Sequence, residues 1–555
     1  MSRQEIKEIL QNLDIRPEYF DNEAYSQTLI ILINLVERQS VENEKLKLEI
    51  QKLRDEINLL KGEQGKPNIR GNTPGRGKDV SSEKELKQPE KKKKKKSKSK
   101  KQNIRIDRTE ECKVDRSKLP ADAEFKGHEP ALVQEILITT DNVEYRRELF
   151  YSPSEKRTYM GELPVGIVGE FGPGIRSLIC ALKYVANTSQ PKIQELLENC
   201  GIQISQPTIS RILINDETGF NQEKKDIFYA ALENTPYQQI DDTTVRVKGI
   251  NQYSQIFCNP YYTAFFTVPG KNRLTILDLL LCGRERRYRF DIKAFGLMSD
   301  FNVSKKVRKQ LLDLTEDKEI SEAEMQALLQ QVFKKGKGKN TKTRIMEAAA
   351  IAAYHRQTDV PVVDILLADD APQFKKITAE LALCWVHEGR HYNRLNPLVQ
   401  CNKDALKNFK TRFWDFYRDL LKYKNNPSPE MAEKLSLEFD KLFSTKTVYE
   451  DLNDRIEKSR NKKEHLLMVL KHPCLPLHNN DSELGARVEK RRQDVSLHTI
   501  SEAGTTAKDA FLTIVNTAKK LGVNAFQYIN DRVSQKFSMP ALSDLIVEKA
   551  KLQPG

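Results

Sequence analysis

Apolar side chains recur at alternating steps of three and four residues between positions 25 and 60, a spacing that predicts one long helix with a heptad seam. The seam consists of Tyr25, Leu29, Leu32, Val36, Gln39, Asn43, Leu46, Ile50, Leu53, Ile57 and Leu60. With leucine at d, isoleucine at two a positions and one asparagine at a, the pattern is typical of a parallel two-stranded coiled coil. The charge pairs expected across such a coil are Glu42 with Lys47, Glu49 with Arg54, and Glu56 with Lys61. We expect a homodimer through residues 25–60; the alternative is a single helix packed on the chain's own core.

The periodicity stops at Gly62. Residues 63–118 are rich in Gly, Pro, Lys and Ser, which predicts a disordered basic linker. Its lysine tract runs unbroken from Lys91 to Lys96. Such a tract adds salt-dependent affinity for phosphates, although it can also be a solvated tail. The net charge of +14 likewise favours a polyanionic partner.

Two helices joined through a glycine turn follow within residues 173–236, after a small strand-rich module at 119–172 with a predicted turn at 140–142. Ser189 precedes the first helix and Ser205 the second, which carries proline in its first turn. This pattern predicts a helix-turn-helix that binds DNA, with an ordinary helical hairpin as the alternative. The residues expected to reach base edges or phosphates are Gln206, Thr208 and Arg211.

Strands dominate from position 237 onward. A run of alternating side chains begins at Asp241, and "QYSQIFC", "YYTAFFTV" and "RLTILDLLLC" predict further antiparallel strands. Residues 362–368 are almost wholly apolar, as in a strand buried on both faces, and they end in Asp369 and Asp370. Later, Glu483 lies in the first turn of a predicted helix. Basic residues follow on that helix, namely Arg487, Lys490, Arg491 and Arg492.

These patterns divide the chain into ten segments. They are N-terminal helices with the coiled coil (1–62), linker (63–118), strand-rich module (119–172), helix-turn-helix (173–236), α/β core (237–302), charged helical insertion (303–355), core (356–400), helical insertion (401–473), core with the Glu483 helix (474–535) and tail (536–555). Eight cysteines occur without a CxxC pair, which argues against a zinc site and for a reducing compartment. We expect a cytoplasmic, nucleoid-associated protein without a membrane span. Cys384 and His387 are spaced as half of a metal site could be, but no matching second pair exists, so we expect His387 and the Trp385 ring to have a structural role near the acids.

Three of the acids, Asp241, Asp369 and Glu483, occupy positions from which they could converge. In a ribonuclease-H-like α/β fold the first and central strands are neighbours, and a later helix packs beside them. Clustered carboxylates need a cation, and all-oxygen ligands suit Mg²⁺ or Mn²⁺. Two such ions would support in-line displacement at a DNA phosphate. Each acid alone has an ordinary explanation: a solvated turn, a helix cap, or a favourable helix-dipole position.

The three motifs together resemble DDE transposases of the insertion-sequence sixty-six family. "QIDDTTVRVKG" resembles that family's "DET-V-V" segment, "LLADDAPQF" with "CWVHEGRHY" resembles "DGYAGY" with "CWAHARRKF", and "HNNDSELGARVEKRR" resembles "DNNLAERAIRP". The resemblance implies binding of the inverted ends of a mobile element, strand cleavage and joining to target DNA, with Asp241, Asp369 and Glu483 catalytic. It also implies that basic residues hold DNA backbone near Glu483, namely Arg487, Lys490, Arg491 and Arg492. Asp242 and Asp370 replace the family's Glu and Gly, so each ligand could be one position away.

Two alternatives stay open at this stage. The first is a coiled-coil DNA-binding protein with an inactive catalytic fold, acting as a repressor or scaffold. It would bind element ends without cutting them. The second is a nuclease of branched DNA that never joins strands.

Overall fold

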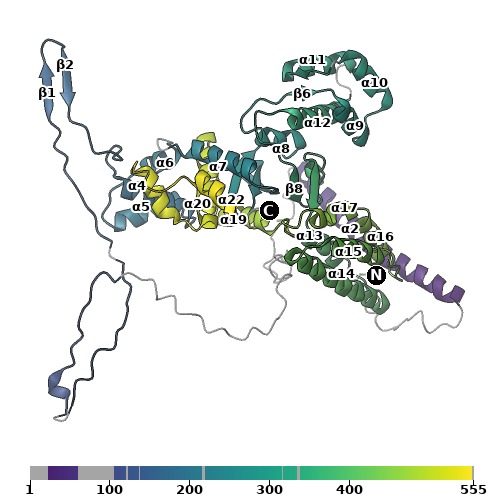
Figure 1. The fold of residues 1–555 in the computed structure, drawn as a ribbon, viewed down its shortest axis with the longest axis horizontal. Helices are drawn as coiled ribbons and strands as arrows, with labels where there is room; N and C mark the ends of the chain where they lie inside the picture. The colour runs from purple at the N-terminus through teal and green to yellow at the C-terminus, as the bar shows by residue number, and fades with distance from the viewer. Residues whose placement is uncertain are drawn as a thin grey trace.

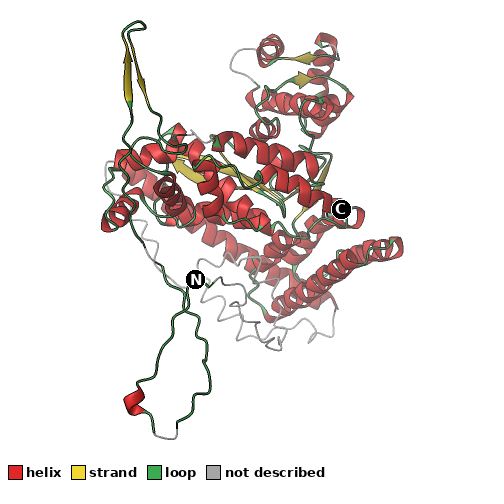
Figure 2. Cartoon of the chain, turned by 60° about the vertical axis from the view of Figure 1, so that its left-hand side comes forward, coloured by secondary structure: helices red, strands yellow, loops and turns green. Residues whose placement is uncertain are grey.

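The computed structural model describes residues 23–60, 106–120, 123–136, 138–215, 219–315, 317–333 and 338–552. The lysine tract of the linker and residues 1–22 lie outside these ranges. Helices surround one central sheet, and two further helical lobes extend from it (Figures 1 and 2). The chain is therefore a mixed α/β protein rich in helix.

Five strands form the central sheet in the order β5-β4-β3-β8-β9. They are β3 (Gln238–Val247), β4 (Ile250–Cys258), β5 (Thr263–Val268), β8 (Ile365–Ala368) and β9 (Glu380–Leu383). The first three pair antiparallel, whereas β8 pairs parallel with both β3 and β9. The sheet is thus mixed, and β3, from the first part of the core, lies beside β8 from the second.

Local sequence explains the turns and burial of this sheet. Lys248 and Gly249 both have positive φ, as a two-residue hairpin between β3 and β4 requires. All four residues of β8 are buried, which confirms the strand predicted from the apolar run. Strand β3 begins at Gln238 rather than at Asp241, so that acid lies inside the strand and not at its start.

One predicted strand is a helix. The segment "RLTILDLLLC" forms α8 (Arg273–Leu280), because Asn272 caps its first turn by accepting a hydrogen bond from the Thr275 backbone at 3.0 Å. A short apolar run fits a buried helix as well as a strand, and the capping residue decides between them.

Eight helices pack beside the sheet or on one another next to it. They are α4 (Pro173–Tyr184), α5 (Gln190–Asn199), α6 (Gln206–Ile214), α7 (Phe220–Asn234), α19 (Asn480–Asp494), α20 (Glu502–Leu521), α21 (Ala525–Val533) and α22 (Leu542–Leu552). The expected helix pair is present as α5 and α6, with Gly201 at positive φ between them and Ser205 capping α6. Residues 542–552 were predicted to be tail but form α22, whose Leu542 and Ile546 are fully buried.

Two helical lobes interrupt the core, at upper and lower right in Figure 1. The first contains α8, α9 (Ile292–Asp300), α10 (Lys305–Leu314), α11 (Glu322–Val332), α12 (Lys339–Arg356) and the short pair β6 (Tyr288–Arg289) and β7 (Glu319–Ile320). The second contains α13 (Trp385–Asn393), α14 (Gln400–Asn425), α15 (Pro429–Leu442), α16 (Glu450–Arg460), α17 (Lys463–Leu466) and α18 (Met468–Lys471).

The segment before α4 differs from the strand-rich module that we predicted. Its described part contains one hairpin, β1 (Leu149–Ser152) with β2 (Arg157–Met160), which projects from the body (Figure 1). The predicted turn at 140–142 is not a hairpin turn; the chain reverses at 153–156 instead. Upstream lie extended chain and one short 3₁₀ turn, η3 (Arg116–Lys118).

The predicted long helix is α2 (Glu23–Leu60). One stripe of its first half docks on the second lobe: Glu37 accepts hydrogen bonds from the backbone of Leu398 and Val399, and Asn34 donates to the Val448 carbonyl at 2.9 Å. The heptad seam lies on a neighbouring stripe. Its side chains stay largely exposed, with Leu46 at 49% and Leu53 at 53%. Docking on the chain's own lobe therefore leaves the seam uncovered.

Candidate active site

Adjacent acids on β3 point to opposite sides of the sheet, because side chains alternate along a strand. Asp242 is held by two partners: Lys271 Nζ lies 3.2 Å from its Oδ1, and Gln373 Nε2 donates to its Oδ2 at 2.9 Å. Asp241 lies on the other side and accepts only a local hydrogen bond, from the Asp242 backbone, among those that the structure describes. The two acids therefore have different surroundings, and Asp241 is the one without a cationic partner.

The same division appears after β8. Asp370 forms salt bridges with Lys375 and Lys462, whose ammonium groups each lie 2.6 Å from one of its carboxylate oxygens. Burial opposes the charge of Asp370, but these two lysines hold the pKa of its carboxyl below the ordinary value. Asp369 has no ion pair among the described residues, and its Oδ1 accepts from the Ala371 backbone at 3.0 Å. Of these two acids, Asp370 is thus the one that lysines hold, and Asp369 is the one that no described ion pair engages.

Close packing of α19 on the sheet sets the position of Glu483. A Cβ at Gly485 would lie 2.7 Å from Ile256 Cγ2 on β4, so glycine is needed for this approach. Just before the helix, Asn479 donates its side-chain amide to the Ile240 carbonyl at 2.9 Å and fastens the start of α19 beside Asp241. Asn479 occupies the N-cap position of α19, and Asn480 and Asp481 lie inside the helix.

The electrostatics of Asp241 link these three acids. Burial, together with the charges of Asp369 and Glu483, raises the pKa of Asp241 to about 8. Carboxylates without a cation repel one another, and this repulsion favours the protonated form of one of them. Asp241 and Asp369 each follow, two residues later, a paired position of the parallel strands β3 and β8, Gln239 and Leu367.

Sequence reasoning missed the side chain that holds Glu483. Arg390 on α13 donates to Glu483 Oε2 at 2.9 Å and lies 3.0 Å from His387 Nε2. If that nitrogen accepts from Arg390, His387 Nδ1 carries the proton and faces Glu483 Oε1 at 3.5 Å. The available signal was the spacing of His387 and Arg390, which places both on one face of a helix.

Cys384 completes this cluster. Its sulfur, a ring nitrogen of His387 and an oxygen of Glu483 lie within 4.8 Å of one another, a set that could hold a metal ion. Burial raises the pKa of the Cys384 thiol to about 11, and its sulfur accepts from the Asn479 backbone at 3.2 Å. The protonated thiol therefore ties α13 to the start of α19, next to the carboxylates.

A buried ion cluster connects α13 to α16. Glu388 is 3% exposed and forms a salt bridge with Arg455 of α16. Lys462 lies 3.0 Å from Glu388 and also forms a salt bridge with Asp370. Its ammonium group therefore connects the chain beside Asp369 to α13, the helix that carries Arg390. The second lobe thus positions parts of the site.

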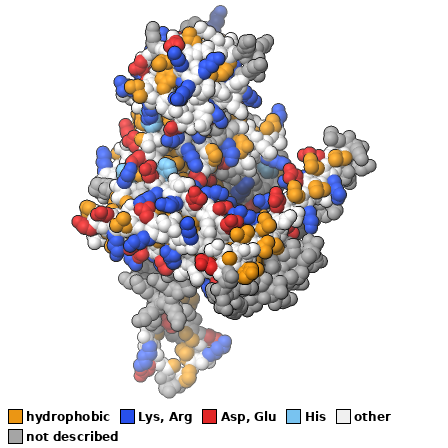
Figure 3. Space-filling view, turned by 90° about the vertical axis from the view of Figure 1, so that its right-hand side faces the viewer, with side chains coloured by type: hydrophobic (Ala, Val, Ile, Leu, Met, Phe, Trp, Pro, Cys, Tyr) orange, Lys and Arg blue, Asp and Glu red, His pale blue; other side chains and the backbone are white. Residues whose placement is uncertain are grey.

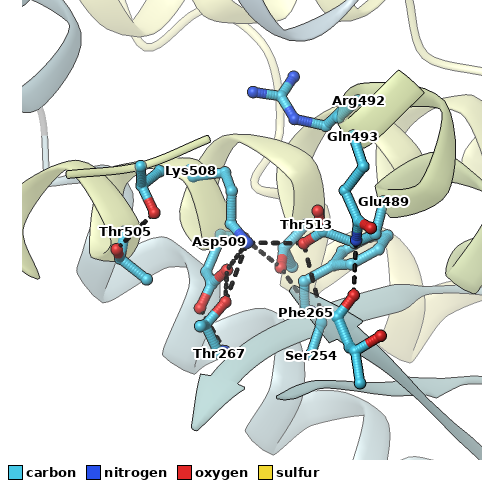
Figure 4. Close-up of polar contacts among 12 residues, drawn as sticks. Ser254, Phe265, Thr267, Glu489, Arg492, Gln493, Thr505, Lys508, Asp509 and Thr513 are labelled. Carbon is cyan, nitrogen blue, oxygen red and sulfur yellow. Dashed lines mark hydrogen bonds and ion pairs between the residues drawn. The ribbon is translucent and has the colours of Figure 1, made fainter. Parts of the chain in front are cut away.

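The opposite face of α19 is anchored by a second buried network (Figure 4). Lys508 of α20 lies 2.7 Å from Glu489 and 3.3 Å from Asp509, and Asp509 accepts hydrogen bonds from Thr267 of β5. Burial opposes the charge of Lys508, but the two carboxylates raise its pKa above the ordinary value. The network ties α19, α20 and the sheet edge together.

The predicted DNA-contacting residues of α19 divide into two groups. Lys490 and Arg491 are exposed and Arg487 is half-buried. Arg492 is 2% exposed and donates to the Lys183 carbonyl at 3.2 Å. This corrects the prediction for Arg492, which holds α4 and is not placed to contact DNA.

On α6, Gln206 and Arg211 are exposed, whereas Thr208 is half-buried with its hydroxyl 3.0 Å from that of Ser205. Their assignment to DNA stays a prediction. On the face shown in Figure 3, basic and acidic side chains are interspersed rather than gathered into one basic surface.

Comparison with known proteins gives one relative and no assigned activity. The chain is 29% identical over 339 residues to uncharacterized protein y4jO of Sinorhizobium fredii (strain NBRC 101917 / NGR234), a match that covers 58% of this chain and the whole of that protein. No family model matches. Among the described residues, no helix combines the length and apolar character needed to cross a membrane.

Proposed function

We propose that this chain is a DNA transposase that binds the inverted ends of a mobile element and catalyses metal-dependent strand cleavage and transfer into target DNA. The observation that supports the proposal is the raised pKa of Asp241, to which the charges of Asp369 and Glu483 contribute, together with the parallel pairing of β3 and β8 two residues before Asp241 and Asp369. The placement of the three acids on β3, after the adjacent parallel strand β8, and on a helix packed beside both is the arrangement expected of a ribonuclease-H-like core. The motif resemblance to the insertion-sequence sixty-six family agrees with it.

The three carboxylates suit Mg²⁺ or Mn²⁺, since hard divalent ions prefer carboxylate oxygens. Their mutual repulsion is what such a cation would relieve. When bound, one or two ions would activate a water or a DNA 3′-hydroxyl and stabilise the leaving oxygen at phosphorus. Arg390 would keep Glu483 in place, and the lysines on Asp242 and Asp370 would keep these neighbouring acids out of the metal site.

Substrate binding is assigned to three parts of the chain. The pair α5–α6 would read the element ends through Gln206, Thr208 and Arg211, and the linker lysines would add sequence-independent affinity. Arg487, Lys490 and Arg491 would hold DNA backbone beside Glu483. A homodimer through residues 25–60 would pair two ends.

The test is a cleavage and strand-transfer assay on DNA that carries the element's own ends. We expect Mg²⁺-dependent products that disappear in EDTA and in Asp241→Asn, Asp369→Asn and Glu483→Gln, while end binding is kept. Asp242→Asn and Asp370→Asn are matched controls, because each removes an adjacent carboxylate that a lysine already holds. Wild-type protein that binds ends but cuts with no divalent ion would contradict the proposal and favour the scaffold.

A further inference from the structure

A basic groove runs along the second lobe beside the site. It is a hollow of about 570 Å³ on one face of α14, lined by Lys403, Lys407, Lys410 and Trp414 among others. These four residues follow one another at steps of four, three and four, so they share one side of the helix. Among the described ion pairs, none involves Lys403 or Lys407. The groove is therefore a row of positive charge with an aromatic ring at one end.

The aromatic end of this groove lies against the helix that holds the site. A Cβ at Gly389 would lie 2.7 Å from the Trp414 ring, so that ring rests directly on the backbone of α13. The next residue along α13 is Arg390, which holds Glu483 at 2.9 Å. The aromatic end of the groove thus lies against the helix that carries Arg390.

The spacing of the lysines suits a nucleic-acid backbone. With a rise of about 1.5 Å per residue, Lys403, Lys407 and Lys410 follow one another at intervals of roughly 6 Å and 5 Å along α14. Phosphates repeat about every 3.4 Å along one strand of a DNA duplex, so neighbouring lysines can each meet a different phosphate. Lysine serves such contacts as a point charge on a flexible stem.

We propose that the groove of α14 binds the phosphate backbone of DNA whose strand continues to Asp241, Asp369 and Glu483. This rests on the proposed function for the reaction at the carboxylates, but the binding itself needs no metal. The helical insertion is then a DNA-binding part of the protein and not only a support for α13. Neither the predicted helix-turn-helix nor the linker lysines account for this surface.

The test compares two triple variants of the full chain. One is Lys403→Gln, Lys407→Gln and Lys410→Gln; the control is Lys305→Gln, Lys306→Gln and Lys309→Gln, which removes the same charge from exposed lysines of α10 in the other lobe. Binding of a short DNA duplex of arbitrary sequence is measured across salt concentrations in EDTA. Log affinity falls with log salt, and each lost phosphate contact makes this slope shallower by about 0.9. We therefore expect the slope of the groove variant to be shallower than that of wild type by roughly 2 to 3, and the control to keep the wild-type slope.

A second readout locates the DNA. The chain has two tryptophans, and Trp385 is fully buried, so DNA in the groove should change the fluorescence of Trp414. The change should vanish in Trp414→Phe. Equal slopes in both triple variants, or a groove variant that alters self-association and not DNA binding, would overturn the proposal.

The Asp241→Asn variant separates this proposal from the proposed function. It should keep both the wild-type salt slope and the Trp414 response. If wild type never cleaves DNA but the groove variant binds it with a shallower salt dependence, the groove proposal is supported and the proposed transposase reaction is contradicted. If cleavage occurs but the groove variant keeps its slope, the reaction stands and the groove proposal fails.

Discussion

At the scale of single residues, the orientation of Glu483 depends on Arg390. Glu483 is 8% exposed, and Arg390 donates a hydrogen bond to its Oε2 at 2.9 Å, which holds the side chain in place. For Arg390→Gln we expect cleavage to fall about 10- to 100-fold, as is usual when a residue that orients a metal ligand is lost. We also expect half-maximal activity to require more Mg²⁺, because Glu483 is no longer held in place.

The Arg390 prediction is checked by cleavage rates across a series of Mg²⁺ concentrations. Arg390→Lys should recover part of the activity, since it restores the charge but not the contact to both Glu483 and His387. A loss of rate with no shift in the Mg²⁺ midpoint would show that Arg390 has only a structural role.

Lys508 is the residue on which the anchoring network depends. Lys508→Met removes the closest cation from buried Glu489 and Asp509, although Lys224 stays 4.0 Å from Asp509, and we expect a loss of about 3–5 kcal/mol in the free energy of unfolding. Because the folded-state pKa of Lys508 is raised, its contribution is fully present below the ordinary lysine pKa and is lost as the pH rises through the raised value.

Urea unfolding at neutral pH measures the Lys508 effect. Adding Glu489→Gln to Lys508→Met should return part of the stability, since one unpaired charge is removed. A Lys508→Met protein as stable as wild type would show that the network contributes little.

At the scale of elements, the position of α19 on β4 decides where Glu483 lies. Gly485→Ala places a methyl group 2.7 Å from Ile256, so we expect α19 to shift outward, at a cost of about 1–3 kcal/mol of stability and with a loss of cleavage. Ile256→Ala removes the clashing atoms. Activity that returns in the double variant would confirm the contact, whereas a fully active Gly485→Ala protein would contradict it.

The sequence predicted those elements whose patterns are local. The heptads marked α2, serine caps and a glycine turn marked α5 and α6, and the apolar run marked β8. It failed where local patterns are ambiguous: α8 is short and apolar, and the described part of the segment before α4 contains one hairpin, β1–β2. Such cases are decided by capping and tertiary packing rather than by periodicity.

The same limit applies to the site. Sequence pattern selected the three acids but could not separate Asp241 from Asp242 or Asp369 from Asp370. That distinction comes from Lys271, Lys375 and Lys462, which are brought in by the fold from other parts of the chain. The burial of Arg492 and the role of Arg390 likewise depend on contacts that are distant in sequence.

At the scale of the whole molecule, α2 docks one stripe on its own lobe and leaves the heptad stripe exposed, and we expect a second copy to pack on that stripe. We expect Leu46→Glu with Leu53→Glu to convert a dimer to a monomer in sedimentation experiments, because like charges would replace the d-position leucines. Glu37→Gln is the matched control on the docked stripe, and it should leave the dimer intact. A wild-type protein that sediments as a monomer would contradict the coiled coil.

The central claim is that Asp241, Asp369 and Glu483 form one metal site, and Mn²⁺ binding followed by electron paramagnetic resonance tests it most directly. Wild type should bind Mn²⁺, and Asp241→Asn, Asp369→Asn and Glu483→Gln should each weaken that binding strongly, whereas Asp370→Asn should bind as wild type does. If wild type takes up no Mn²⁺, or if the three variants bind it as well as wild type, the three carboxylates are not a metal site and the proposed reaction loses its basis.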